Sequence, residues 1–207
     1  MEILTSLLYK AIPGYISMLF DRYGNPALVY HNLEHTRRVV SRAMEIAGSY
    51  KLEERESFVL FSAAWFHDAG QLFTVPEEHE QRSVSIMREF MLGHGTDEEV
   101  INLIEGCILA TRIPHRPQTF LQQIICDADT YNLGTDEFIT TDDQLREELS
   151  LRGFDTSIGW HQSTLAFLRR HRFFTSYCQQ LLLAGKQKNM DTIIGCIKNS
   201  GTDKLST

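Results

Sequence analysis

Apolar residues recur along this chain at the spacing of α-helices, and no convincing run of alternating apolar and polar residues predicts a β-strand. Residues 57–68 are almost continuously apolar, which predicts a central helix buried on most sides, with Gly70 as its stop signal. Residues 36–48 form an amphipathic helix whose apolar stripe consists of Val39, Val40, Ala43, Ile46 and Ala47. The pattern therefore predicts an all-α fold.

Turn and capping residues divide the rest of the chain into further helices. Pro76 predicts the start of one helix, and Thr96 predicts the N-cap of the next. Two prolines make residues 111–119 a loop. Further helices are predicted from Phe120 onward, over residues 142–151, and over two stretches of residues 160–198 that break near residues 171–175.

The bulk composition fits one folded domain with at most a small appendage. The chain has 207 residues, 43% of them hydrophobic, which is enough apolar material for a buried core. The net charge is −7, so a large nucleic-acid footprint is not expected.

The cysteines and the hydropathy pattern predict a cytoplasmic protein. None of the four cysteines forms a C-x-x-C pair, which excludes a zinc ribbon, and each lies in an apolar helical context that suits a reducing compartment. The chain shows no secretory signal pattern and no apolar stretch of the ~18 residues that a membrane span needs. We therefore expect no membrane partner.

Histidine and aspartate gather in three separated segments that otherwise resemble core helices. A carboxylate at Asp68, after the most apolar helix, needs a positive partner, and a divalent cation is one such partner. Imidazole and carboxylate together suit Mn, Fe, Zn, Co or Ni, and suit Mg less well. The three segments supply His31 and His35, then His67 and Asp68, and finally Asp127 and Asp129.

Each segment also has a purely structural interpretation. A single histidine on an apolar face is most often a hydrogen-bonded core residue, and Asp127 and Asp129 could cap a helix. Taken alone, the residue chemistry leaves a metal site and these structural roles equally open.

The order of these residues resembles the HD superfamily of metal-dependent phosphohydrolases. The string YHNLEH at residues 30–35 is similar to the opening of the metal site in cyclic-nucleotide phosphodiesterases, which share the helical core of that superfamily. A closer resemblance is to small bacterial predicted HD phosphohydrolases, through the strings YHNLEHTRRVV, AAWFHDAG, HEQRS, ILATRIPH, ICDADTYNLG, LREEL, FLRRHRFFT and GKQKN. The resemblance covers about residues 30–189.

The resemblance implies a single HD-type domain, with a core of about five helices at about residues 25–150 and a helical extension at about 155–200. It implies one or two divalent metal ions, and a homodimer is compatible with it. The implied metal ligands are His35, His67, Asp68 and Asp129, with Asp127 as the second choice for the last position.

The implied reaction is attack of water on a phosphoester or phosphoanhydride in a small phosphorylated molecule, with a nucleotide expected by analogy alone. The metal would lower the pKa of its water toward ~7 and polarise a phosphoryl oxygen. By analogy with the phosphodiesterases, His31 would protonate the leaving oxygen, while Asp68 or Asp127 would accept the proton of the water.

Two other functions share this ligand set. One is a metal-dependent hydratase, lyase or oxygenase, which would not need cationic side chains for phosphate. The other is a non-enzymatic ligand sensor, although a sensor is expected to carry a degenerate site.

Several residues are weaker candidates for substrate binding. Arg112, His115 and Arg116 lie in the one compact cationic loop and could contact phosphate, with an ordinary exposed loop as the alternative. His79 could bind substrate or a second metal, but the charged run EEHEQR favours a solvated helix face. His94 follows a helix end and is set aside.

Overall fold

The computed structural model describes residues 2–202, and the side chains of residues 5–76 and 78–199. The chain divides into two compact units, and the division falls between Asp129 and Thr130 in the sequence. The described residues form α-helices and short 3-10 helices without a β-strand, which confirms the all-α prediction. No described helix combines the length and the apolar character needed to cross a membrane. The prediction that the whole chain is a single domain stays a prediction.

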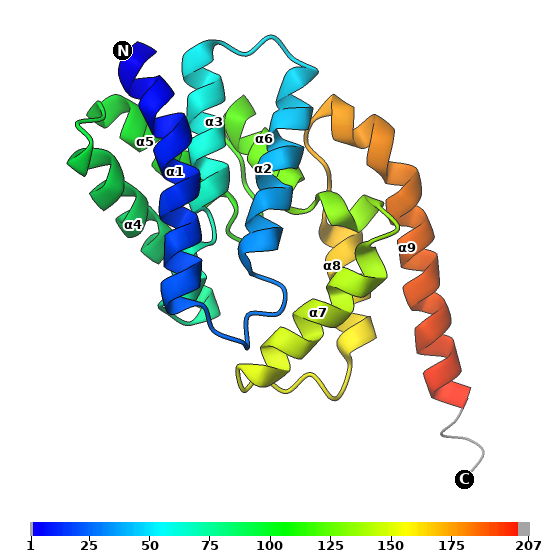
Figure 1. Cartoon of the computed structure of the whole chain (residues 1–207). Helices are drawn as coiled ribbons and strands as arrows, with labels where there is room; N and C mark the ends of the chain where they lie inside the picture. The colour runs from blue at the N-terminus through cyan, green and yellow to red at the C-terminus, as the bar shows by residue number, and fades with distance from the viewer. Residues whose placement is uncertain (1, 203–207) are drawn as a thin grey trace. The chain divides into compact units, whose positions relative to one another are not determined.

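The first unit is a bundle of helices around α3 (Figure 1). Helix α3 packs against α1, α2, α4, α5 and α6, and eight of its residues are buried, as the continuous apolar run predicts. The elements of this unit are α1 (Glu2–Tyr23), α2 (Leu33–Gly48), α3 (Glu54–Phe66), η1 (Ala69–Leu72), η2 (Pro76–Glu78), α4 (His79–Gly93), α5 (Glu98–Ala110) and α6 (Phe120–Asp129).

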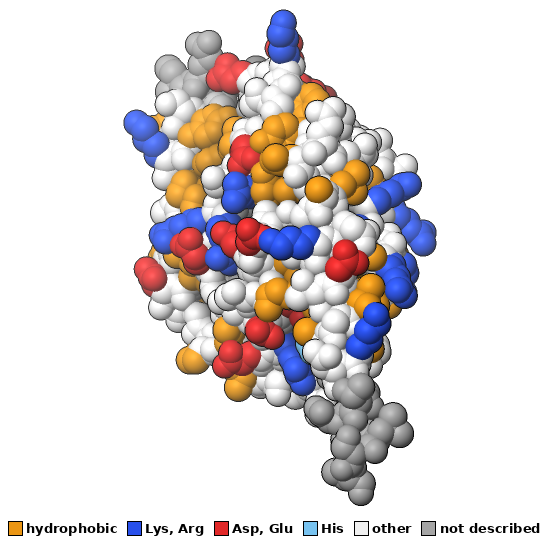
Figure 2. All heavy atoms as spheres, turned by 90° about the vertical axis from the view of Figure 1, so that its right-hand side faces the viewer, with side chains coloured by type: hydrophobic (Ala, Val, Ile, Leu, Met, Phe, Trp, Pro, Cys, Tyr) orange, Lys and Arg blue, Asp and Glu red, His pale blue; other side chains and the backbone are white. Residues whose placement is uncertain are grey.

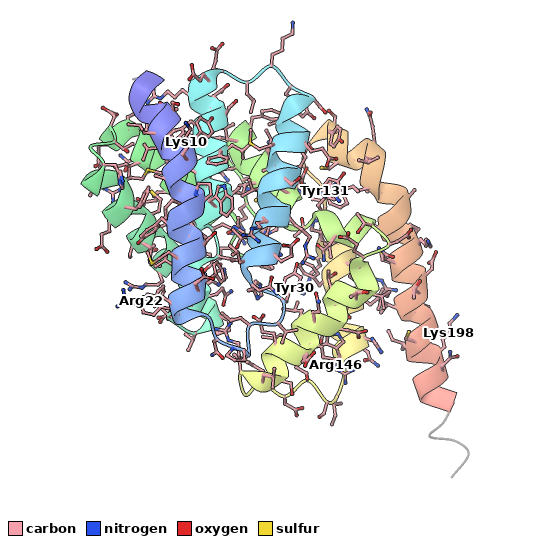
Figure 3. All side chains as sticks on the ribbon, viewed as in Figure 1. Lys10, Arg22, Tyr30, Tyr131, Arg146 and Lys198 are labelled. Atoms are coloured by element: carbon pink, nitrogen blue, oxygen red, sulfur yellow. The ribbon has the colours of Figure 1, made fainter. Side chains whose placement is uncertain are left out.

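Helix α2 begins at Leu33, so His31 precedes the helix and does not share a helical face with His35. Asn32 caps the helix, because its side-chain oxygen accepts hydrogen bonds from the backbone N–H groups of Glu34 and His35, each at 3.0 Å. Tyr30 lies in the segment just before this cap (Figure 3). The cap thus fixes the direction in which the chain enters α2.

Three local predictions differ from the structure. Asp97 caps α5 in place of Thr96, since its carboxylate accepts from the N–H of Glu99 at 2.8 Å. Pro76 opens a 3-10 turn, and the α-helix starts only at His79. Gly70 lies inside η1 and is not a helix stop.

Gly70 is required by close packing. A Cβ atom at this position would lie 2.0 Å from the backbone oxygen of His79 and 2.8 Å from the backbone nitrogen of Ser83. The N–H of Gly70 also donates to Oγ of Ser83 at 2.8 Å. The chain after α3 is therefore pressed against the first turn of α4, which brings His79 close to the loop that carries Asp68.

The second unit contains η3 (Tyr131–Gly134), α7 (Phe138–Leu151), α8 (Trp160–Arg170) and α9 (Ser176–Thr202). The predicted break between the last two helices is confirmed. Gly185 on α9 touches η3 so closely that a Cβ atom there would lie 2.0 Å from the backbone oxygen of Gly134. Asn189 strengthens this contact, because its side-chain amide donates to the backbone oxygens of Leu133 and Thr135, each at 2.9 Å.

Candidate metal centre

His35 reaches the centre of the first unit from the first turn of α2. The Asn32 cap holds this turn, and the imidazole is buried, with 3% of the residue exposed. Its ring lies against that of Tyr30, with 4.7 Å between the ring centroids. A cap and an aromatic neighbour thus orient the ring.

His67 and Asp68 lie just past the C-terminal end of α3. His67 is fully buried, and its Nδ1 lies 2.8 Å from the backbone oxygen of Ala64. Because a carbonyl oxygen only accepts hydrogen bonds, Nδ1 carries the proton and Nε2 of the neutral ring presents a lone pair. Asp68 is 4% exposed and points toward the same space.

Asp129 is the last residue of α6. Both carboxylates therefore lie at or just beyond the C-terminal ends of helices, where the helix dipole disfavours negative charge. A cation at this point would offset both the burial and the dipoles.

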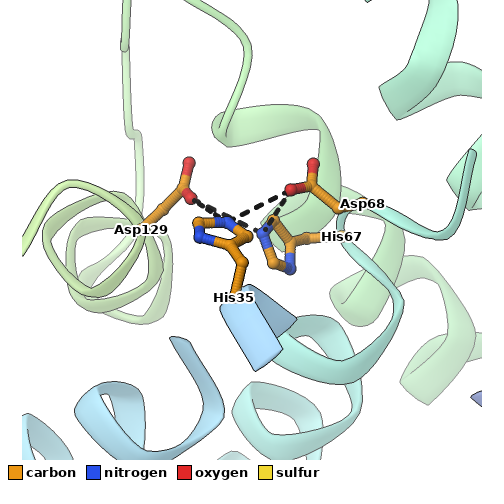
Figure 4. A group of neighbouring side chains, drawn as sticks. All are labelled: His35, His67, Asp68 and Asp129. Atoms are coloured by element: carbon orange, nitrogen blue, oxygen red, sulfur yellow. Dashed lines mark ion pairs between the residues drawn. The ribbon is translucent and has the colours of Figure 1, made fainter. Parts of the chain in front are cut away.

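The four side chains converge on one point, and their ligand atoms all lie within 4.8 Å of one another (Figure 4). Nε2 of His35 is 3.2 Å from Oδ2 of Asp68 and 3.3 Å from Oδ1 of Asp129. Nε2 of His67 is 3.2 Å and 3.5 Å from the same two oxygens.

The facing atoms leave their hydrogen-bonding capacity unused. Nε2 of His35, Nε2 of His67 and Oδ2 of Asp68 are buried, and none makes a hydrogen bond of normal geometry. In the neutral ring of His67, the Nδ1–H group donates to the backbone oxygen of Ala64, so the lone pair of Nε2 faces two carboxylate oxygens. Acceptors gathered in this way fit a divalent cation, and two imidazoles with two carboxylates suit a transition metal.

The charges of the site shift the pKa of each member. Burial alone would lower the pKa of His35 and His67, but attraction to Asp68 and Asp129 outweighs it and raises both, that of His67 strongly. Burial would raise the pKa of the two aspartates, but the histidines hold both below the usual range. The site therefore keeps its carboxylates ionised and attracts positive charge.

Asp127 does not join the group. It is completely buried on α6, two positions before Asp129, and residues two apart on a helix face in different directions. The geometry therefore favours Asp129 over Asp127 as the fourth metal ligand.

His31 lies next to the four ligand candidates without belonging to them. Its ring centroid is 5.7 Å from that of His35 and 6.4 Å from that of His79. Its charge also contributes to the lowered pKa of Asp68, after the larger effects of burial and His67.

The prediction of a solvated face at His79 and Glu80 is wrong. Nε2 of His79 lies 3.3 Å from Oδ1 of Asp68, the second oxygen of that carboxylate, and Nδ1 lies 2.5 Å from the backbone oxygen of Pro76. Burial lowers the pKa of His79, but interaction with Asp68 outweighs it and raises the pKa to about 9. Glu80 is only 5% exposed.

A signal for Glu80 was present in the sequence. Glu80, Val84 and Met87 recur at helical spacing and share the buried face of α4. A carboxylate on a buried helix face is costly without a positive partner, so its presence there indicates a functional site.

The three members of the cationic loop have different surroundings. Nε of Arg112 lies 3.6 Å from Oε2 of Glu80, so this arginine is linked to the site. Nε2 of His115 lies 3.1 Å from the backbone oxygen of Thr111, within the loop itself. Arg116 is exposed. His94 packs on the ring of Phe90 and lies outside the group of four.

The HD domain family model matches residues 32–133, a span that contains His35, His67, Asp68 and Asp129. No curated protein and no solved structure matches the chain significantly. The family match and the converging histidines and aspartates agree with each other. Residues 32–133 therefore form an HD domain, a family in which metal-dependent hydrolases predominate.

Proposed function

We propose that this protein is a divalent-metal-dependent phosphohydrolase that acts on a phosphoester or phosphoanhydride of a small molecule. The observation that carries the proposal is a group of buried atoms without hydrogen bonds, Nε2 of His35, Nε2 of His67 and Oδ2 of Asp68, whose side chains converge with that of Asp129. A divalent cation held there lowers the pKa of water and polarises a phosphoryl oxygen.

The remaining groups of the site support proton transfer and anion binding. His31 and His79 lie beside the ligand group, and we propose that one of them protonates the leaving oxygen. We assign Asp68 as the acceptor for the proton of the water, because Asp127 is not one of the four side chains whose ligand atoms converge. Arg112 supplies positive charge for the phosphoryl oxygens, and this charge favours hydrolysis of a phosphate ester over a lyase or oxygenase reaction.

The net charge of −7 suits a small substrate better than a long nucleic acid. Across the middle of the face shown in Figure 2, basic side chains lie among acidic ones. A nucleotide is the first substrate that we propose, because the phosphodiesterases that the YHNLEH string resembles act on nucleotides. None of the four cysteines forms a disulfide and three of them are buried, which agrees with the proposed cytoplasmic location.

The test is a screen of phosphorylated substrates with added Mn²⁺, Co²⁺, Ni²⁺, Zn²⁺ or Mg²⁺. We expect hydrolysis of small phosphate esters that a chelator abolishes, that a His67→Ala/Asp68→Ala variant lacks, and that His94→Ala retains. Stoichiometric bound metal with no hydrolysis of any phosphate substrate would contradict a phosphohydrolase and favour one of the other HD-type functions.

A further inference from the structure

Glu80 is a buried carboxylate that the reaction described above does not use. It lies in the first turn of α4 on the same face as Ser83 and Met87, and 5% of it is exposed. A buried carboxylate is costly without a positive partner, so its neighbours indicate why it is there.

The two oxygens of Glu80 face in two directions. Oε1 lies 3.8 Å from Nε2 of His79, which itself lies 3.3 Å from Oδ1 of Asp68. Oε2 lies 3.6 Å from Nε of Arg112 and accepts no hydrogen bond. Glu80 therefore lies between Arg112 and His79, and His79 in turn contacts the ligand candidate Asp68.

Arg112 is oriented so that part of its guanidinium group remains available. Its side chain is 53% exposed, and among the described residues Glu80 is its one ion-pair partner. Because Nε faces Glu80, the two terminal amino groups are left for another acceptor. Two parallel N–H donors of this kind match the oxygens of a phosphate group.

We propose that Glu80 is a positioning residue that holds Arg112 beside the metal centre, so that the terminal amino groups of the guanidinium bind a phosphoryl oxyanion of the substrate. This inference rests on the proposed phosphohydrolase function and adds to it the residue that orients the anion-binding group. Glu80 does not touch the substrate in this arrangement.

A second cation between Asp68, His79 and Glu80 is the competing explanation. The guanidinium of Arg112 already brings a positive charge to Glu80, and this charge would repel a cation placed beside it. Among the described residues, the group whose ligand atoms fit around one ion consists of His35, His67, Asp68 and Asp129, without His79 or Glu80. The arginine is therefore the better partner.

The test measures metal content by elemental analysis and the binding of inorganic phosphate by calorimetry, on protein carrying its metal. We expect Glu80→Gln and Arg112→Gln each to weaken phosphate binding by about tenfold or more, the usual effect of losing a hydrogen bond to a charged group. The metal content should not change. In the double variant the two losses should not add, because Glu80 acts through Arg112.

Two further variants separate positioning from a structural role. Glu80→Asp keeps the charge and should retain more phosphate affinity than Glu80→Gln. Glu99→Gln removes a carboxylate that pairs with Arg55 at 2.9 Å elsewhere in the same unit, and it should leave phosphate binding unchanged.

Three results would overturn the inference. In the first, the wild-type protein holds metal but does not bind phosphate. In the second, variants of Glu80 or Arg112 keep the phosphate affinity of the wild type. In the third, Glu80→Gln loses a second equivalent of metal. If Glu80→Gln does not fold, Arg112→Gln at the exposed loop still decides. Failure of the proposed function would instead appear as wild-type protein without metal or without metal-dependent hydrolysis.

Discussion

Nε2 of His67 lies 3.5 Å from Oδ1 of Asp129, so the C-terminal ends of α3 and α6 meet at one point inside the first unit. Each helix end carries partial negative charge, and each adds a carboxylate, Asp68 from one and Asp129 from the other. The bundle thus concentrates negative potential where the lone pairs of two imidazoles also point. Such a concentration of carboxylates, helix ends and imidazole lone pairs fits a cation.

The double variant His67→Ala/Asp68→Ala tests the ligand assignment. It removes one imidazole and one carboxylate, and we expect metal affinity to fall by more than the ~10–100-fold typical of losing an outer-shell partner. Elemental analysis of protein purified without chelator should find stoichiometric metal in the wild type and in His94→Ala, but little in the double variant. Retention of stoichiometric metal by the double variant would defeat the assignment.

The cap at Asn32 links the stability of α2 to the position of His35. Asn32→Ala removes the acceptor of two backbone N–H groups and should cost about 1 kcal/mol of unfolding free energy. Because His35 is one of the two residues capped, metal affinity should fall as well. Urea denaturation and metal titration measure the two effects.

The matched control for Asn32→Ala is Asp97→Ala, which removes the equivalent cap of α5. It should reduce stability by a similar amount and leave metal affinity unchanged. Equal losses of metal affinity in the two variants would show that Asn32 acts through general stability alone.

Much of the first unit could be predicted from the sequence, because helical periodicity and stop signals are local. The buried run at residues 57–68 was enough to predict the central helix, because it depends on residue types and spacing alone. The converging group of His35, His67, Asp68 and Asp129 followed from the resemblance of their order to the HD superfamily, since the residue chemistry alone left a metal site open.

What the sequence did not reveal depends on distant packing. Gly70 resembles a helix stop, yet its role comes from the backbone of His79, which meets it only in the folded chain. Glu80 shares the apolar stripe of α4, but the charged run around it suggests solvent, and its burial follows from the position of α4 beside the loop after α3. Tertiary contacts of this kind override local preference.

The pKa shifts of the histidines predict how metal binding changes stability with pH. Burial lowers the pKa of His79, but the interaction with Asp68 outweighs burial and raises this pKa from 6.5 to about 9. The pKa values of His35 and His67 are also raised. A raised histidine pKa stabilises the metal-free fold fully below the ordinary value, and this contribution is lost as pH rises through the raised one.

Metal binding depends on pH in the opposite sense, because it requires neutral imidazoles at His35 and His67. The increase in Tm on adding Mn²⁺ should therefore grow as pH rises above 6.5, the ordinary histidine pKa, through the raised pKa of His35 and His67. Thermal melts with Mn²⁺ and with chelator, compared across this range, measure it. An increase that shrinks as pH rises would contradict the predicted competition between protons and metal.

In the second unit, Asn189 stabilises the packing of η3 against α9. It is 5% exposed and donates to the backbone oxygens of Leu133 and Thr135. Asn189→Ala leaves two carbonyls near α9 without this donor and should cost about 1–3 kcal/mol of unfolding free energy. Asn189→Asp should cost more, because a carboxylate would face the two carbonyl oxygens.

Gln187→Ala removes only an exposed hydrogen bond to Asp191 and should change stability by less than about 0.5 kcal/mol. Chemical denaturation ranks the three variants, and equal stability of Asn189→Ala and Gln187→Ala would show that the amide does not hold η3 against α9.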